Sequence, residues 1–165
     1  MGVSGAGKTT VGKAVAGRLG WEFLDADDYH SPEARKKMSS GTPLDDADRA
    51  PWLDRLAAML RARVEEGANT VLACSALKDT YRKTLAGGRP GDIVFVYLSV
   101  PREVLAERQG ARRGHFFRPE LLDSQLQTLE EPGGAIAVDA SGSPEAVVEE
   151  VLSAIGRGKA GVETA

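Results

Sequence analysis

A chain of 165 residues has the size of one ordinary domain and can bury a self-sufficient core. With 42% apolar and 27% charged residues its composition is globular, which excludes long disordered or collagen-like stretches. The net charge of −3 gives no reason to expect a nucleic acid or an anionic membrane as partner, and no apolar run is long enough to span a membrane. The amino terminus lacks the pattern of a secretory signal, so we expect a cytoplasmic protein.

Helical and strand-like hydrophobic patterns alternate along the chain, which predicts an α/β fold with a mainly parallel sheet and helices on both faces. Helices are predicted over residues 9–19, from 32 onward, and over 51–66, 77–85, 101–112, 119–129 and 143–155. Strands are predicted over residues 21–25, 70–74, 92–98 and 135–139, the second ending at the only cysteine, which we expect to be buried. We expect one domain over 1–155, with a lid segment near 108–122, and a flexible tail over 156–165.

Residues 2–9 read GVSGAGKT, which matches the phosphate-binding P-loop pattern, and a helical pattern follows at once. Glycines let the backbone wrap around phosphate oxygens, while amide groups and a helix N-terminus favour negative charge. We expect Lys8 to bridge the outer phosphates of ATP during catalysis and Thr9 to ligate Mg²⁺. A flexible glycine-rich terminus is the alternative. The expected ATP-binding residues of this segment are Gly2, Val3, Ser4, Gly5, Ala6, Gly7, Lys8, Thr9 and Thr10.

A P-loop ordinarily follows a buried strand, but only Met1 precedes this one. Burial of a central strand contributes several kcal/mol, against a total stability of about 5–15 kcal/mol. We therefore expect the true start to lie upstream, so that the first strand of the fold is truncated in this sequence. The alternative is a loop that is held without its usual strand.

Three acidic residues, Asp25, Asp27 and Asp28, come where the predicted strand 21–25 ends. Ligands of doubly wound sheets bind at this edge. A carboxylate there can accept the proton of an attacking hydroxyl or hold Mg²⁺ through water. We expect Asp27 to be functional and Asp28 to belong to a solvated turn that caps a helix.

Further sequence blocks resemble the gluconokinase family, small P-loop sugar-acid kinases with a shikimate-kinase-like fold related to the nucleoside monophosphate kinases. The resemblance runs from residue 2 to about residue 150 and implies a three-layer P-loop fold. Its blocks are FLDADDYH (23–30), KMSSGTPL (37–44), DR (48–49), PWL (51–53), ACSALK (73–78), YR (81–82), GHFF (114–117), LL (121–122), SQ (124–125) and LEEP (129–132).

The resemblance implies ATP-dependent phosphorylation of D-gluconate to 6-phospho-D-gluconate with magnesium, and it suggests a homodimer. Asp27 matches the acidic residue that orients the acceptor hydroxyl, and Asp25 the one near magnesium. Arg49 and Arg82 match the cations that hold the substrate carboxylate, which suits the two-point pairing of guanidinium groups with carboxylates. His30 matches a position facing the sugar-acid chain, although a histidine hydrogen-bonded in a loop explains it nearly as well.

Four arginines between residues 108 and 118, interrupted by glycines, indicate a mobile lid that brings positive charge to the transferring phosphoryl group. We expect Arg108 to pack against adenine and Arg112 to contact phosphate as a catalytic residue. By resemblance His115 faces the lid. Residues 139–144 (DASGSP) resemble a loop that cradles adenine, or form a simple strand-to-helix turn.

Two alternatives stay open. The first is a kinase for another small hydroxy acid such as shikimate, against which the blocks at residues 37–44 and 114–117 argue. The second is a nucleotide-binding protein without catalytic activity, favoured by the absent first strand.

Overall fold

The structure is a computed structural model that describes the backbone of residues 1–89, 91–110 and 119–160, and the side chains of these except 119–120 and 157–160. In chain order its elements are α1 (Lys8–Leu19), β1 (Glu22–Asp25), the 3₁₀ helix η1 (Ala26–Tyr29), α2 (Pro32–Ser39), α3 (Asp46–Glu65), β2 (Thr70–Ala73), α4 (Asp79–Ala86), β3 (Val96–Ser99), α5 (Arg102–Gly110), α6 (Pro119–Thr128), β4 (Ile136–Asp139) and α7 (Pro144–Ala160). Within this described part, no helix is long and apolar enough to cross a membrane.

The four strands form two parallel pairs. β1 pairs with β2, with Glu22 opposite Thr70, and β3 pairs with β4, with Val96 opposite Ile136. The parallel α/β arrangement predicted from the hydrophobic pattern is confirmed.

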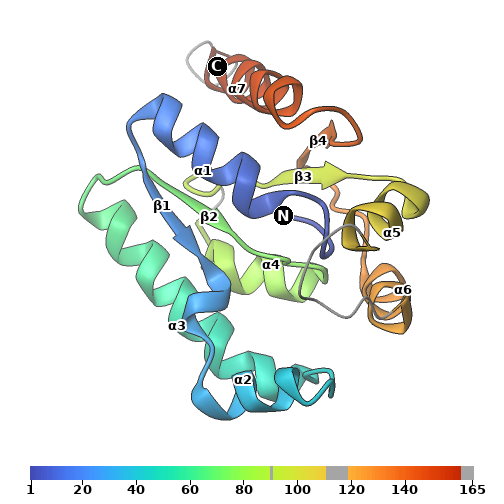
Figure 1. The fold of residues 1–165 in the computed structure, drawn as a ribbon. Coiled ribbons are helices and arrows are strands. Elements are labelled where there is room, and N and C mark those ends of the chain that lie inside the picture. Colours follow the sequence, from blue (N-terminus) through green and yellow to red (C-terminus); the bar gives the residue numbers. More distant parts are fainter. Residues whose placement is uncertain (90, 111–118, 161–165) are drawn as a thin grey trace.

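The first two residues connect the two pairs of strands. The Met1 amine donates to the Val96 carbonyl, and the Met1 carbonyl accepts from the Leu98 amide at 3.0 Å. On the other side, the Gly2 amide donates to the carbonyl of Ser75, just beyond β2, at 3.2 Å. The P-loop therefore starts from the middle of the sheet, between β2 and β3 (Figure 1). The upstream strand stays a prediction.

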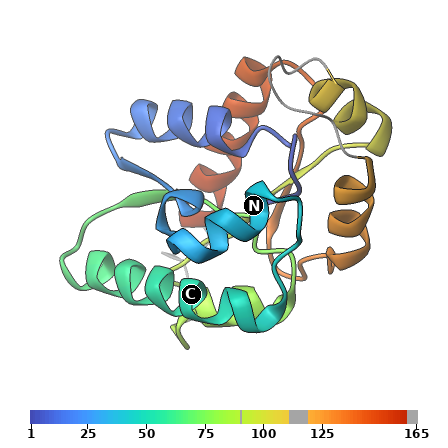
Figure 2. The same cartoon turned by 60° about the horizontal axis from the view of Figure 1, so that its bottom comes forward.

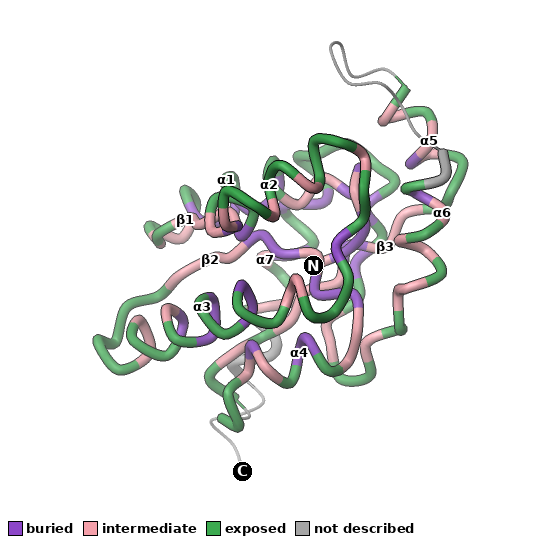
Figure 3. The backbone as a smooth tube through the Cα atoms, turned by 90° about the horizontal axis from the view of Figure 1, so that it is seen from below, coloured by how far each residue is buried: buried purple, intermediate pink, exposed green. Residues whose placement is uncertain are grey.

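Helices cover both faces of the strands, which gives the three layers predicted. Helices α1 and α7 pack together on one face, and α3 and α4 pack together on the other (Figures 1 and 2). Each face has its own apolar core. One includes Val15, Leu98 and Val138, and the other is centred on Leu56 and Trp52. Figure 3 shows the buried parts of these helices turned inward and their outer faces exposed.

Three predicted boundaries were wrong. Helix α3 begins at Asp46, not at Pro51, because the side chains of Asp45 and Asp48 each accept the other's backbone amide and cap the helix end. Helix α7 continues through Gly156 to Ala160, since a helical glycine costs only about 1 kcal/mol and ends a helix only when it turns left-handed.

The third wrong boundary is that of the strand predicted over residues 92–98. Strand β3 begins only at Val96, because its partner β4 begins at Ile136. Residues 161–165 of the predicted tail lie outside the described part of the chain.

Candidate active site

The P-loop has the backbone conformation that its glycines allow. Gly7 caps α1 with φ +90°, and Gly2 has φ +143°. A Cβ atom on Gly2 would lie 2.9 Å from the Leu98 carbonyl oxygen, so a larger residue could not keep this close approach to β3. The N-terminus of α1 follows this loop directly, and a helix N-terminus favours an anion.

Two residues that the sequence predicts to hold Mg²⁺ are in contact. Thr9, in the first turn of α1, donates its hydroxyl to Oδ2 of Asp25 at 2.9 Å, and Asp25 is the last residue of β1. Magnesium is usually bound by one or two protein oxygens together with phosphates and waters. A hydroxyl beside a carboxylate at a P-loop fits that chemistry. A dedicated cage is not present, since the described residues contain no group of three or more potential metal-binding side chains.

Lys8 and Asp27 come from different elements, α1 and η1. Lys8 donates from Nζ to the Val3 carbonyl at 2.9 Å, so its side chain lies along the P-loop. Asp27 is connected to the P-loop through Asp25, whose carboxylate accepts the Thr9 hydroxyl at Oδ2 and the Asp27 amide at Oδ1. The carboxylate of Asp27 is 89% exposed.

His30 is a buried ring beside this carboxylate. It stacks on Trp52 with ring centroids 4.4 Å apart, and its Nε2 lies 4.0 Å from Oδ1 of Asp27. Burial is the main cause that lowers the pKa of His30, and the positive charges of Arg35 and Arg49 add to it, against the opposing charge of Asp27. At neutral pH the ring is therefore uncharged and faces the acceptor side with one edge.

An open cavity of about 540 Å³ lies between the start of α3 and the start of α4. Arg49 and Lys78 contribute cationic side chains to its wall, and the Arg49 guanidinium lies over the ring of Tyr81, 5.9 Å from its centroid. Lys78 donates to both carboxylate oxygens of Asp46, at 2.8 and 2.7 Å, and the Tyr81 hydroxyl donates to the same carboxylate. The remaining lining residues are 44–45, Ala47 and Thr128.

Arg82, predicted as a second carboxylate-binding arginine, is buried. Its side chain is 8% exposed, and Nη1 donates to the carbonyls of Ala76 at 3.1 Å and Leu77 at 3.0 Å. Arg82 is not among the described residues that line the 540 Å³ cavity. Its contact with a substrate stays a prediction.

Helix α5 connects the P-loop with the expected adenine loop. Arg108 donates to the carbonyls of Ser141 at 3.0 Å and Gly142 at 3.2 Å, so it lies against the loop that follows β4. The neighbouring Gln109 donates to the Ser4 carbonyl of the P-loop at 2.8 Å. Arg108 therefore lies against the loop that is expected to hold adenine, and its role in nucleotide binding stays a prediction. Arg112 and His115 lie outside the described residues, as does the part of the lid segment over 111–118.

Several polar residues of the site were not predicted from the sequence. The residues are Asp46, Lys78, Tyr81, Gln109 and Gln125. Gln125, in α6, accepts the Ser4 amide at 2.7 Å, so two glutamines from separate helices contact the P-loop. Lys78, Tyr81 and Gln125 stand within the blocks that carry the resemblance, but polarity alone does not distinguish them from surface residues.

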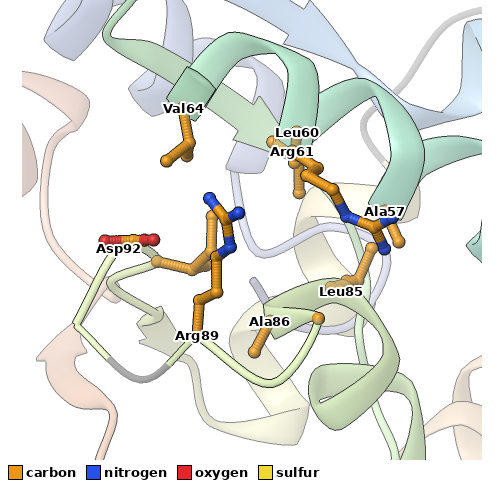
Figure 4. Close-up of a pocket in the computed structure, with 10 residues that line it drawn as sticks. Ala57, Leu60, Arg61, Val64, Leu85, Ala86, Arg89 and Asp92 are labelled. Atoms are coloured by element: carbon orange, nitrogen blue, oxygen red, sulfur yellow. The ribbon is translucent and has the colours of Figure 1, made fainter. Parts of the chain in front are cut away.

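A second hollow lies between α3 and the end of α4 (Figure 4). Arg61 and Arg89 stand over an apolar floor that includes Leu60 and Leu85. Its volume is about 10 Å³, which is the space of a single water molecule and too little for a ligand. We therefore place no binding site there.

A phosphate-binding loop that starts in the middle of a parallel sheet, with a hydroxyl and carboxylate pair at its end, defines a P-loop nucleotide-binding protein, and an open cavity with charged side chains offers room for a small acceptor. The model of the shikimate kinase family matches residues 4–155. The gluconokinase of Gluconobacter oxydans is 48% identical over 155 residues, which cover 92% of this chain and 86% of that protein. The chain belongs to the shikimate kinase family and, within it, to the gluconokinases, which confirms the resemblance found in the sequence blocks.

Two further comparisons agree with this assignment. The thermoresistant gluconokinase of Escherichia coli is 40% identical over 163 residues, covering 96% of this chain and 93% of that protein. The crystal structure of a gluconokinase from Sinorhizobium meliloti superimposes with a TM-score of 0.90 at 40% identity, over 100% of this chain and 95% of that one. The predicted fold class is thereby confirmed.

Proposed function

We propose that the protein transfers the γ-phosphoryl group of ATP to D-gluconate and releases ADP and 6-phospho-D-gluconate. One observation carries the proposal together with the family: the Asp25 carboxylate accepts the Thr9 hydroxyl beside the P-loop at one oxygen and the Asp27 amide at the other, which connects the expected nucleotide side to the expected acceptor side. Phosphoryl transfer requires a phosphate cradle, an oriented acceptor hydroxyl and positive charge close together. The P-loop, Asp27 and Lys8 are the residues that we propose for these three tasks.

On the nucleotide side, the amides of residues 2–9 and the N-terminus of α1 would hold the β- and γ-phosphates. Lys8 would exchange the Val3 carbonyl for a phosphate oxygen, which needs only rotation of its long side chain. Arg108 would pack against adenine beside the loop at Ser141. Thr10, exposed in the first turn of α1, completes the proposed ATP site.

Thr9 and Asp25 are the residues that we propose to hold Mg²⁺. When bound, this ion neutralises the charge that develops on the phosphate oxygens. Asp25 is also fixed from the η1 side, because its Oδ1 accepts the Asp27 amide at 3.2 Å. This bond holds the backbone of Asp27 next to the Asp25 carboxylate.

On the acceptor side, Asp27 would accept a hydrogen bond from the terminal hydroxyl of gluconate and take its proton as the hydroxyl attacks. The neutral ring of His30 would face the carbon chain. Arg49 would hold the substrate carboxylate from α3. The predicted contact of Arg82 would require its guanidinium to leave the carbonyls of Ala76 and Leu77, so Arg49 is the arginine that we place on the substrate.

The resemblance supports further parts of the proposal. Arg112 would contact the transferring phosphoryl group, and His115 would lie at the lid. Both residues lie outside the described part of the chain. A cytoplasmic location and a homodimer are proposed on the same ground.

The test is a coupled assay of ADP formation with gluconate, shikimate, glycerate and a nucleoside monophosphate as acceptors. We expect turnover with gluconate and a far lower kcat/KM with the other three. If kcat/KM is highest with shikimate, then shikimate and not gluconate is the acceptor. ATP binding without turnover of any acceptor would identify a nucleotide-binding protein without catalytic activity and reject the proposal.

A further inference from the structure

Lys78 has the position and charge of a substrate-binding residue. It precedes α4 as the N-cap residue, and its side chain, 29% exposed, lies in the wall of the 540 Å³ cavity together with Arg49. Hydrogen bonding to Asp46 raises the pKa of Lys78, so the ammonium group is charged throughout the neutral range. Two of its three N–H groups can serve the oxygens of Asp46, which leaves one for a ligand.

The loop that leads to Lys78 is held in an unusual conformation. Ala76 has φ +45° and is the only residue other than glycine with positive φ in the described part of the chain. Such strain persists only where the surrounding structure imposes it, and it is common at functional sites. Here Arg82 binds the carbonyls of Ala76 and Leu77 from one side. From the other side the Glu130 amide donates to the Leu77 carbonyl at 2.9 Å.

The two cations near this loop therefore have different surroundings. Arg82 is buried and engaged with backbone carbonyls, whereas Lys78 reaches the cavity. We infer that Lys78, beside Arg49, binds the carboxylate of the sugar acid, and that Arg82 is a positioning residue that holds the loop carrying Lys78. This inference rests on the proposed function and names the part of the site that recognises the acid group.

The two cations of the cavity differ in their partners. Lys78 pairs with Asp46, and Lys78 and Tyr81 hold Asp46 anionic by lowering its pKa. Arg49 lies over the ring of Tyr81. Asp45 also lines the cavity; its side chain caps α3 and lies 3.9 Å from Lys37, which pairs with Asp48 as well.

The decisive variants are Lys78→Met and, as matched control, Lys83→Met. Lys83 is on the same helix, is 77% exposed and pairs only with Asp79 among its described ion-pair partners. Loss of a charged hydrogen bond to the substrate should raise the KM for gluconate by about ten- to a hundredfold. The KM for ATP should stay within about twofold, and Lys83→Met should behave as the wild type.

A neutral competitor separates a contact with the carboxylate from a structural role. D-glucitol has the same six-carbon chain as gluconate, with an uncharged hydroxymethyl group in place of the carboxylate. Lys78→Met should leave the inhibition constant of D-glucitol unchanged, whereas it should raise the KM for gluconate. Equal weakening of both compounds would overturn the inference, because a damaged cavity, and not a lost ion pair, would then explain the result.

A double-mutant cycle tests the role of Arg82. If Arg82 acts through Lys78, then Arg82→Met should add little to the effect of Lys78→Met on the KM for gluconate, whereas two direct contacts would give multiplicative effects. Because Arg82 is buried, Arg82→Lys serves as the milder variant, and the melting temperature identifies any variant that fails to fold. Multiplicative effects would indicate that Arg82 contacts the substrate directly.

Failure of the inference differs from failure of the proposed function. If the wild type phosphorylates no gluconate, the proposed function fails and the inference falls with it. If the wild type is active and Lys78→Met keeps the wild-type KM for gluconate, only the inference is overturned.

Discussion

The hydroxyl of Thr9 donates to Oδ2 of Asp25 at 2.9 Å, although the two residues lie at the beginning of α1 and at the end of β1. The contact exists because α1 runs away from the strand edge and β1 returns to it. Two side-chain oxygens from different elements thereby meet beside the P-loop.

Asp25→Asn should raise the Mg²⁺ concentration required for half-maximal activity, because the amide has lost the charge that attracts the ion. We expect an increase of about tenfold or more, from the usual strength of charged hydrogen bonds. Titration of ADP formation with Mg²⁺ at saturating ATP measures it. An unchanged Mg²⁺ requirement would contradict the role assigned to Asp25.

Lys8→Met should lower kcat by about a hundredfold or more, since it removes a charge that stabilises the transferring phosphoryl group. Lys13→Met, an exposed change on the same helix, is the control and should leave kcat near the wild-type value. Steady-state kinetics measure both. Turnover of Lys8→Met within about tenfold of the wild type would be incompatible with the assignment.

Asp27→Asn should lower kcat by about 10²–10⁴ if its carboxylate takes the proton of the acceptor hydroxyl. Because the side chain is 89% exposed, the melting temperature should hardly change. Asp28→Asn, at the adjacent exposed position, is the matched control. A kcat of Asp27→Asn equal to that of the control would show that this carboxylate does not take part in the reaction.

Arg49→Ala should raise the KM for gluconate by about ten- to a hundredfold and leave the KM for ATP nearly unchanged. Arg61→Ala removes the same charge from the exposed face of the same helix, away from the acceptor cavity. Kinetics with each substrate varied in turn compare the two. If Arg49→Ala changes only the KM for ATP, Arg49 binds the nucleotide and not the acceptor.

The stability of the protein should depend on pH through His30. Its pKa is lowered in the folded state, mainly by burial, with Arg35 and Arg49 acting in the same direction and Asp27 against it. Above the ordinary pKa of 6.5 the ring is neutral in both the folded and the unfolded state, so its protonation does not change the free energy of unfolding. As pH falls below that value, the unfolded chain takes up the proton first, so the free energy of unfolding decreases.

His30→Phe keeps an aromatic ring against Trp52 and removes the titrating group. Urea unfolding at several values between about pH 5 and 8 should show a smaller loss of stability for this variant than for the wild type. Parallel curves for the two proteins would mean that His30 does not contribute.

The sequence by itself determined the nucleotide half of the site. The P-loop is contiguous, and its function depends on local backbone geometry, such as the positive φ of Gly2 and Gly7, so residues 2–9 identify it without knowledge of the fold. Asp25 and Asp27 could be predicted for a related reason, since the end of a parallel strand lies at the edge where ligands bind. The alternation of apolar patterns was likewise enough to predict the layers.

Only the tertiary structure decided the acceptor half. Lys78 and Arg82 are both basic residues near the start of α4, and the sequence cannot show that one reaches the cavity while the other is buried against the carbonyls of Ala76 and Leu77. The start of α3 was missed for a comparable reason, because a cap formed by Asp45 and Asp48 outweighs the helix-start signal of Pro51. A local motif can be predicted from the sequence because its interactions form within one short segment of the chain. Burial and partnership depend on contacts between residues that are far apart in the chain.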